Sequence, residues 1–198
     1  SDVKAEFSIF DAAFLEEISK MKEKNIAIEL LKKLLAERVT IYQKTNLVQA
    51  EKFSDLLNRA LSNYLKGLLT NEEVIQELLK LAAEISESEN QGNELGLTAE
   101  EKSFYDALTK PRAVQDIYTN EQLVAMTKEL TDALRKNRTI DWQKKESARA
   151  RMRRMIKRLL KKYKYPPEEA ENALETVIHQ CEQWSDNDSD EYSINEST

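Results

Sequence analysis

The chain has 198 residues, a net charge of −6 and 40% hydrophobic residues, enough apolar material for one large or two small domains. It holds only three glycines, three prolines and one cysteine, so β-turn residues are scarce and an internal disulfide is excluded. We therefore predict an all-α protein, a bundle of about seven helices in two halves joined by a polar loop. We expect it in the cytoplasm, because the sequence shows neither a signal region nor an apolar run of roughly 20 residues for a membrane span.

The first half of the sequence carries apolar residues three or four positions apart, which is the spacing of one helical face. The predicted helices span residues 7–21, 25–43, 48–67 and 71–85. The apolar stripe of the first begins at Phe7. That of the second is predicted to hold Ile26, Leu30, Leu34 and Ile41. Gly67 is expected to end the third helix, and Thr70 with Glu73 forms a capping box that starts the fourth.

Residues 86–96, SESENQGNELG, are polar, contain two of the three glycines and lack a helical period. We predict a polar linker there, between an N-terminal helical half at residues 1–85 and a C-terminal helical half at residues 97–185. Residues 186–198 are acidic and are predicted to form a tail. The sequence leaves open whether the two halves are separate domains or share one core.

Capping signals also mark the helices of the second half. Thr98 and Glu101 form a capping box, and either Thr119 or Asn120 caps the next helix. A further helix is predicted over residues 141–164, and the last one begins at Pro167.

The segment DWQKKESARARMRRMIKRLLKKYKYPP, residues 141–167, holds eleven Lys and Arg but only two acidic residues. At about 100° per residue, one face gathers apolar residues around Met152, so this side is predicted to be buried. The opposite arc is cationic. Its candidate contacts with a partner or with DNA phosphates are Arg151, Arg153, Arg154, Lys157, Arg158, Lys161 and Lys162.

Three interpretations of this cationic arc stay open. It is a solvated face that meets acids of neighbouring helices, a surface for duplex DNA, or a surface for a protein partner. Trp142 and Trp184 leave a similar choice between the core and the anchor of an interface.

Motifs of catalysis are missing from the sequence. Glycines occur only at positions 67, 92 and 96, so neither GxxxxGK[ST] nor GxGxxG can be written. His179 and Cys181 lie two apart and therefore on different helical faces, which suits neither a metal pair nor a nucleophile with its base. We expect no catalytic residue, cofactor or metal in this chain.

Three segments of the second half are distinctive: LTAEEKSFYDAL at residues 97–108, ELTDALRKN at 129–137 and the basic segment at 139–167. Their sequences resemble the C-terminal helical region of type I restriction enzyme R subunits, and the resemblance extends more loosely over most of residues 27–169. It implies a longer parent chain with a nuclease domain and two helicase-like motor domains, which uses ATP and Mg to translocate DNA before cleaving it.

By this resemblance the present chain is a non-catalytic assembly module, expected to pack against the motor domains and to dock the R subunit onto the methyltransferase (M) subunit. Direct DNA contact by the basic segment is the alternative. No membrane partner is expected.

Overall fold

A computed structural model describes the backbone of residues 10–196 and the side chains of residues 10–186; Phe7 lies outside this range. The described residues form nine α-helices and no strand, which confirms the all-α prediction. They fall into two compact units. Unit 1 comprises Ser1–Gln43 and Gln49–Glu94, and unit 2 comprises Lys44–Val48 and Leu95–Thr198. Within the described range, no helix is both long and apolar enough to cross a membrane.

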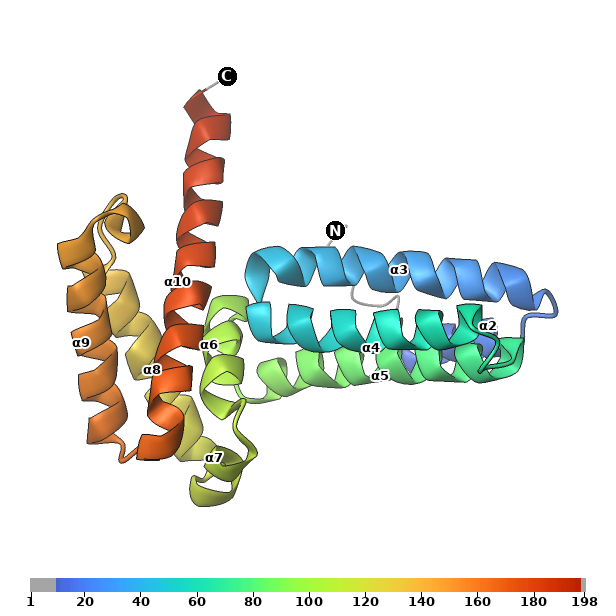
Figure 1. Cartoon of the computed structure of the whole chain (residues 1–198), viewed down its shortest axis with the longest axis horizontal. Coiled ribbons are helices and arrows are strands. Elements are labelled where there is room, and N and C mark those ends of the chain that lie inside the picture. Colours follow the sequence, from blue (N-terminus) through green and yellow to red (C-terminus); the bar gives the residue numbers. More distant parts are fainter. Residues whose placement is uncertain (1–9, 197–198) are drawn as a thin grey trace. The chain divides into compact units, whose positions relative to one another are not determined.

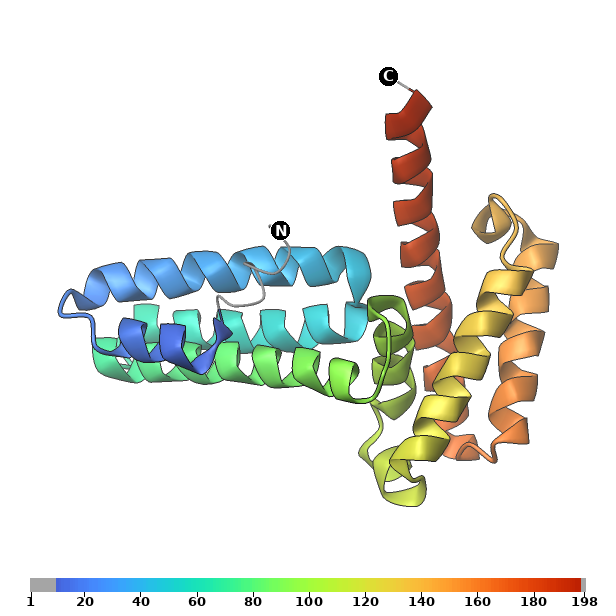
Figure 2. The same cartoon turned by 180° about the vertical axis from the view of Figure 1, so that it is seen from behind.

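Unit 1 is built from α2 (Ala12–Ser19), α3 (Lys24–Thr45), α4 (Leu47–Leu65) and α5 (Asn71–Glu94). The helices α3, α4 and α5 run side by side in Figure 1, and Figure 2 shows α2 against α5. The whole apolar stripe predicted for α5 is buried, and Thr70 and Glu73 exchange both hydrogen bonds of the capping box. The predicted start and buried face of this helix are therefore confirmed.

The predicted apolar side of α3 is partly right, since Leu30 and Leu34 are partly buried and pack against the core, but the fully buried face is rotated by about one residue. Ile26 and Ile41 are 51% and 43% exposed, whereas the buried side chains are Ala27, Ile28, Leu31, Leu35, Arg38, Val39 and Tyr42. Apolar residues cover so much of α3 that two stripes fit the helical period equally well. The choice depends on tertiary contacts, because Arg38 and Tyr42 both reach Glu89 of α5, at 3.5 and 2.7 Å.

The predicted polar linker at 86–96 is wrong for most of its length, because α5 continues to Glu94. Residues of this segment take part in the packing of unit 1. Glu89 accepts the Tyr42 hydroxyl and Gly92 is buried against the bundle. The chain leaves the helix only at Leu95 and Gly96, and Gly96 takes a φ of +70° that favours glycine.

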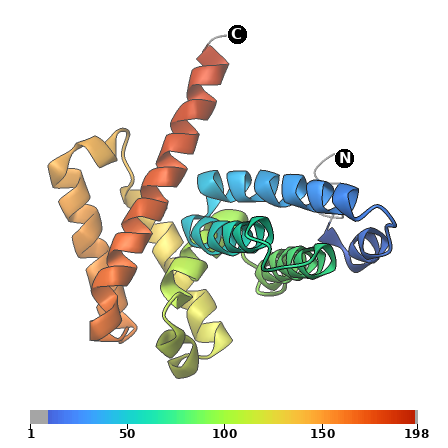
Figure 3. The same cartoon turned by 45° about the vertical axis from the view of Figure 1, so that its right-hand side comes forward.

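Unit 2 contains α6 (Ala99–Thr109), α7 (Arg112–Ile117), α8 (Asn120–Asn137), α9 (Glu146–Lys162) and α10 (Pro167–Glu196). The predicted capping box of Thr98 and Glu101 is present, and of the two cap candidates for α8 the structure has Thr119, which forms a further capping box with Gln122. Helix α6 packs on α8 and α10, and α9 packs on the same two helices, so these four surround one core (Figure 3).

Helix α6 is the centre of unit 2, and it is buried from Lys102 to Thr109. The Lys102 ammonium lies 2.5 Å from the Asp106 carboxylate, which also accepts the Asn46 amide at 2.8 Å. In the segment 44–48, the Leu47 N–H donates to the Gln180 side chain of α10 at 2.8 Å. Lys102 and Asp106 of this buried helix thus have the partners that burial requires.

The basic segment is not one helix from 141 to 164. Asp141 takes a left-handed conformation with φ +56°, Trp142–Lys144 form a 3-10 turn, and α9 begins only at Glu146. The reason is the burial of Trp142, whose indole N–H donates to the Ser185 hydroxyl of α10 at 2.9 Å. A continuous helix would need Asp141 and Lys145 in right-handed helical geometry, whereas Asp141 is left-handed and Lys145 is extended, with φ −107° and ψ 114°. The predicted tail also differs, since the backbone of α10 remains helical to Glu196.

The helices α4 and α9 end in the same Schellman motif with different residues. After α4, the Leu68 N–H donates to Asn63 at 2.9 Å and Gly67 has φ +76°. After α9, the Tyr165 N–H donates to Leu160 at 2.9 Å, and Lys164 has φ +56°. Glycine adopts this geometry without steric cost, whereas the Cβ atom of Lys164 makes it about 1 kcal/mol less favourable in free energy.

We predict that Lys164→Gly raises the free energy of unfolding by roughly 1 kcal/mol, because it removes this steric cost. Urea unfolding followed by circular dichroism measures the change. Lys164→Ala is the matched control, since it removes the same charge but keeps a Cβ atom. Equal stabilisation by both variants would show that charge, and not backbone geometry, destabilises this cap.

Candidate interaction surface on helix α9

No group of three or more His, Cys, Asp or Glu residues that could hold a metal ion occurs in the part of the chain that the structure describes. Cys181 is fully buried, and this burial raises the pKa of its thiol to about 12. A thiol in that state is a poor nucleophile. His179 is exposed, and its Nδ1 lies 3.6 Å from Glu182 on the same helix.

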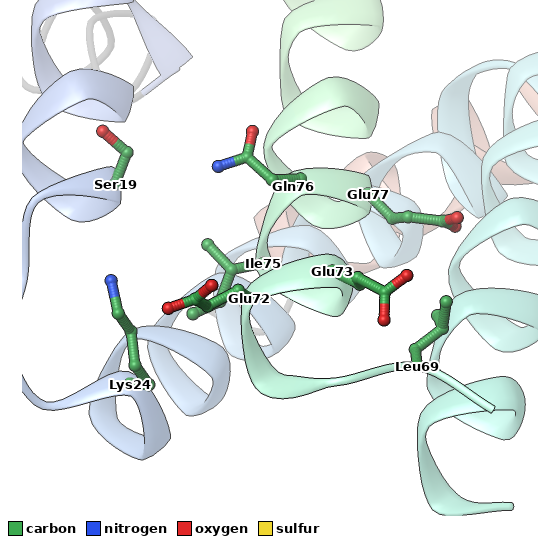
Figure 4. Close-up of a pocket in the computed structure, with 8 residues that line it drawn as sticks. All are labelled: Ser19, Lys24, Leu69, Glu72, Glu73, Ile75, Gln76 and Glu77. Carbon is green, nitrogen blue, oxygen red and sulfur yellow. The ribbon is translucent and has the colours of Figure 1, made fainter. Parts of the chain in front are cut away.

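Unit 1 has an open pocket of about 470 Å³ beside the first turns of α5 (Figure 4). Glu72, Glu73 and Glu77 line it together with Lys24 of α3. The Glu73 carboxylate already accepts the Thr70 N–H at 3.0 Å, and this hydrogen bonding lowers its pKa. The pocket therefore offers exposed acids around a helix cap, and the Ser19 hydroxyl that also lines it donates to the Glu16 carbonyl at 2.6 Å.

The apolar side of α9 lies in the core of unit 2, as predicted. Met152, Ile156, Leu159 and Leu160 are buried. Helix α9 packs on α8 and α10 through this side. The position of these side chains fixes which residues of α9 face outward.

Acidic residues of α10 hold one flank of α9. The Arg149 guanidinium donates to Glu182, and the Arg153 guanidinium donates to both carboxylate oxygens of Glu175. The hydrogen bonds from Arg153 lower the pKa of Glu175 and raise that of Arg153. Of the seven predicted contact residues, Arg153 is thus engaged inside unit 2.

The other end of α9 is held by Glu129 of α8. Its carboxylate accepts the Lys162 ammonium at 2.7 Å and also the Tyr163 hydroxyl. These hydrogen bonds lower the pKa of Glu129, and the same carboxylate raises the pKa of Tyr163 to about 12. Lys162 is therefore a second predicted contact residue with an internal partner.

The remaining five predicted residues form a separate set. They are exposed and make no ion pair with any residue that the structure describes. We call them the α9 stripe: Arg151, Arg154, Lys157, Arg158 and Lys161. Their spacing of three, four and seven residues places them within an arc of about 120°. From Arg151 to Lys161 the stripe is about 15 Å long at 1.5 Å per residue.

The two tryptophans belong to unit 2 itself. Trp142 is fully buried, and the Trp184 indole N–H donates to the Ser103 hydroxyl at 3.0 Å. The structure therefore favours the core over the interface anchor for Trp142, and it gives Trp184 an internal partner.

Exposed apolar side chains lie elsewhere, at positions that sequence reasoning missed. In unit 1, Leu65 and Leu68 are 84% and 68% exposed on either side of Gly67. A Schellman motif usually places the residue after its glycine against an apolar residue of the last turn, but the corresponding position is Asn63. The sequence did contain a signal for these exposed side chains. Leu65 and Leu68 do not belong to the buried face of α4, which includes Phe53, Leu57 and Ala60.

We predict that the pair between Arg153 and Glu175 stabilises unit 2 only above acidic pH. The folded-state pKa of Glu175 is lowered from its ordinary 4.5, so the contribution is complete above that value and lost as the pH falls through the lowered pKa. Glu175→Gln should cost less than about 1 kcal/mol near pH 7, because the pair is partly exposed.

Urea unfolding of wild type and Glu175→Gln at a series of pH values measures this difference. The exposed Glu87 of α5 supplies the matched control, Glu87→Gln. A Glu175→Gln effect that stays constant down to the most acidic pH, or that appears equally in Glu87→Gln, contradicts the prediction.

The sequence matches known proteins over nearly its whole length. Residues 2–187 match the family described as type I restriction enzyme HindI endonuclease subunit-like, C-terminal. The type I restriction enzyme HindI endonuclease subunit of Haemophilus influenzae is 38% identical over 90% of this chain and 17% of its own length. The putative type I restriction enzyme MjaIXP endonuclease subunit of Methanocaldococcus jannaschii is 31% identical over 80% of this chain and 15% of its own.

No solved structure gives a significant match. The chain spans less than a fifth of the length of either relative, and the matching family is defined by the C-terminal part of such subunits. The protein therefore belongs to the family of C-terminal regions of HindI-like type I restriction endonuclease subunits.

Proposed function

We propose that this chain is the assembly domain of a type I restriction-modification R subunit, which docks the motor subunit onto the M core and performs no catalysis itself. The family match over residues 2–187 carries the proposal, because it aligns the whole folded unit pair with the C-terminal region of an endonuclease subunit. The sequence holds no phosphate loop, so ATP and Mg are assigned to the parent subunit outside this chain.

The chemistry of the surface supports the α4–α5 turn as the place where the M subunit docks. Protein interfaces depend on a few apolar or aromatic side chains that become buried on binding, surrounded by polar residues. Leu65 and Leu68 are such side chains, and they sit on a rigid Schellman motif. The α9 stripe contains only cations, and the tryptophans have partners inside unit 2.

We predict that the 198-residue chain co-purifies with the M complex of the same restriction-modification system. The double variant Leu65→Ser, Leu68→Ser should weaken this capture at least about tenfold, as expected for the loss of apolar anchors. Both leucines are exposed, so the substitutions should leave folding intact. Ile117→Ser, at a 59% exposed isoleucine of unit 2, is the matched control.

Charge reversal at Arg151, Arg154 and Arg158 should leave capture unchanged. Loss of capture on charge reversal, with normal capture of the leucine variant, would move the docking surface to α9. Failure of the wild-type chain to bind any M complex would reject the proposed assembly role.

A further inference from the structure

The cations of α9 divide into two classes according to their partners. Arg149, Arg153 and Lys162 lie on the flanks and each pair with an acidic residue of α8 or α10. The α9 stripe lies between these flanks on the outer side. Neither α8 nor α10 places an acid against it among the residues whose side chains the structure describes.

Five like charges this close together repel one another, since neighbours at three and four positions on a helix are about 5–6 Å apart. No ion pair offsets this repulsion among the residues of unit 2 whose side chains the structure describes. An external polyanion would, and the gain is largest where the side chains are already held on a rigid helix. The buried side of α9 provides that rigidity, because Met152, Ile156 and Leu159 fix its rotation.

The residues on this arc indicate whether its binding partner is a nucleic acid or a protein. Besides the five cations, the same arc of α9 holds only Ser147 and Ala150. A protein partner requires apolar anchors at the centre of its interface, and this arc has none. Phosphate groups require only cations and hydrogen-bond donors, and three of the five residues are arginines, which suit phosphate geometry.

The same arc indicates which feature of the nucleic acid is bound. It contains no aromatic residue on which unpaired bases stack, which disfavours single strands. It contains no Asn or Gln for base edges, so it lacks the usual readers of adenine. Duplex DNA carries one charge per about 1.7 Å of its axis, so a stripe about 15 Å long faces several phosphates at once.

We propose that the α9 stripe binds the phosphate backbone of duplex DNA without regard to sequence. This surface is separate from the docking turn at Leu65 and Leu68 and goes beyond the assembly role proposed above. Within a motor subunit the stripe would hold the duplex by its backbone, while Arg149, Arg153 and Lys162 keep α9 in place.

Fluorescence anisotropy with two labelled 20-bp duplexes of unrelated sequence tests the proposal. Both should bind the 198-residue chain with equal affinity at low salt. Binding should weaken steeply with KCl, since each phosphate neutralised contributes about −0.9 to the slope of log K against log salt. The net charge of −6 makes the measurement sensitive to the stripe, because the rest of the chain repels DNA.

The triple variant Arg151→Glu, Arg154→Glu, Arg158→Glu should lose at least about a hundredfold in affinity, since three phosphate contacts become repulsive. The conservative triple variant with lysine at the same positions should retain most of it. The charge-matched control is Lys32→Glu, Lys80→Glu, Lys128→Glu, three exposed lysines of α3, α5 and α8 that make no ion pair among the described residues. This control should lose less than about tenfold.

Three outcomes would overturn the proposal: no duplex binding by the wild-type chain at low salt, equal losses in the stripe and control variants, or a stripe variant that loses the M complex but not DNA. Circular dichroism checks that each variant is folded. The variant Leu65→Ser, Leu68→Ser should bind DNA normally, so failure of docking and failure of DNA binding can be told apart.

Discussion

Three acidic residues beside α9 pair with the cations on its flanks. Glu175 and Glu182 of α10 hold one flank through Arg153 and Arg149, and Glu129 of α8 holds the C-terminal end through Lys162. Each pair is partly exposed and contributes little stability on its own. Together with the apolar side they fix the rotation of α9, so that five further cations lie on the outer surface. Because these acidic residues pair with the flanks of α9, its outer side keeps an exposed basic surface although the net charge of the chain is negative.

Periodicity and capping signals allowed the sequence to predict much of the fold. The buried side of α5, the apolar side of α9 and the boxes at Thr70 and Thr98 follow from local rules, and the structure confirms them. The local rules did not predict which face of α3 is buried or that residues 86–94 are helical. Both depend on the contacts of Glu89 with Arg38 and Tyr42. Such contacts join residues about fifty positions apart and leave no periodic signal.

The candidate surface was predictable only as a group of seven cations. Sequence spacing places Arg153 and Lys162 near the edge of the cationic arc, but their acidic partners lie on other helices. The break before α9 was equally hidden, since it depends on the hydrogen bond between Trp142 and Ser185. Charge in a sequence therefore locates a surface, whereas three-dimensional pairing decides which of its residues remain available.

The burial of Cys181 gives unit 2 a built-in reporter of its own opening. Because this thiol is fully buried and has a raised pKa, it reacts with an alkylating reagent only when α10 separates from its neighbours. As the chain contains a single cysteine, the alkylation rate measures the free energy of that opening without any introduced label. Ligands that hold unit 2 closed slow the reaction.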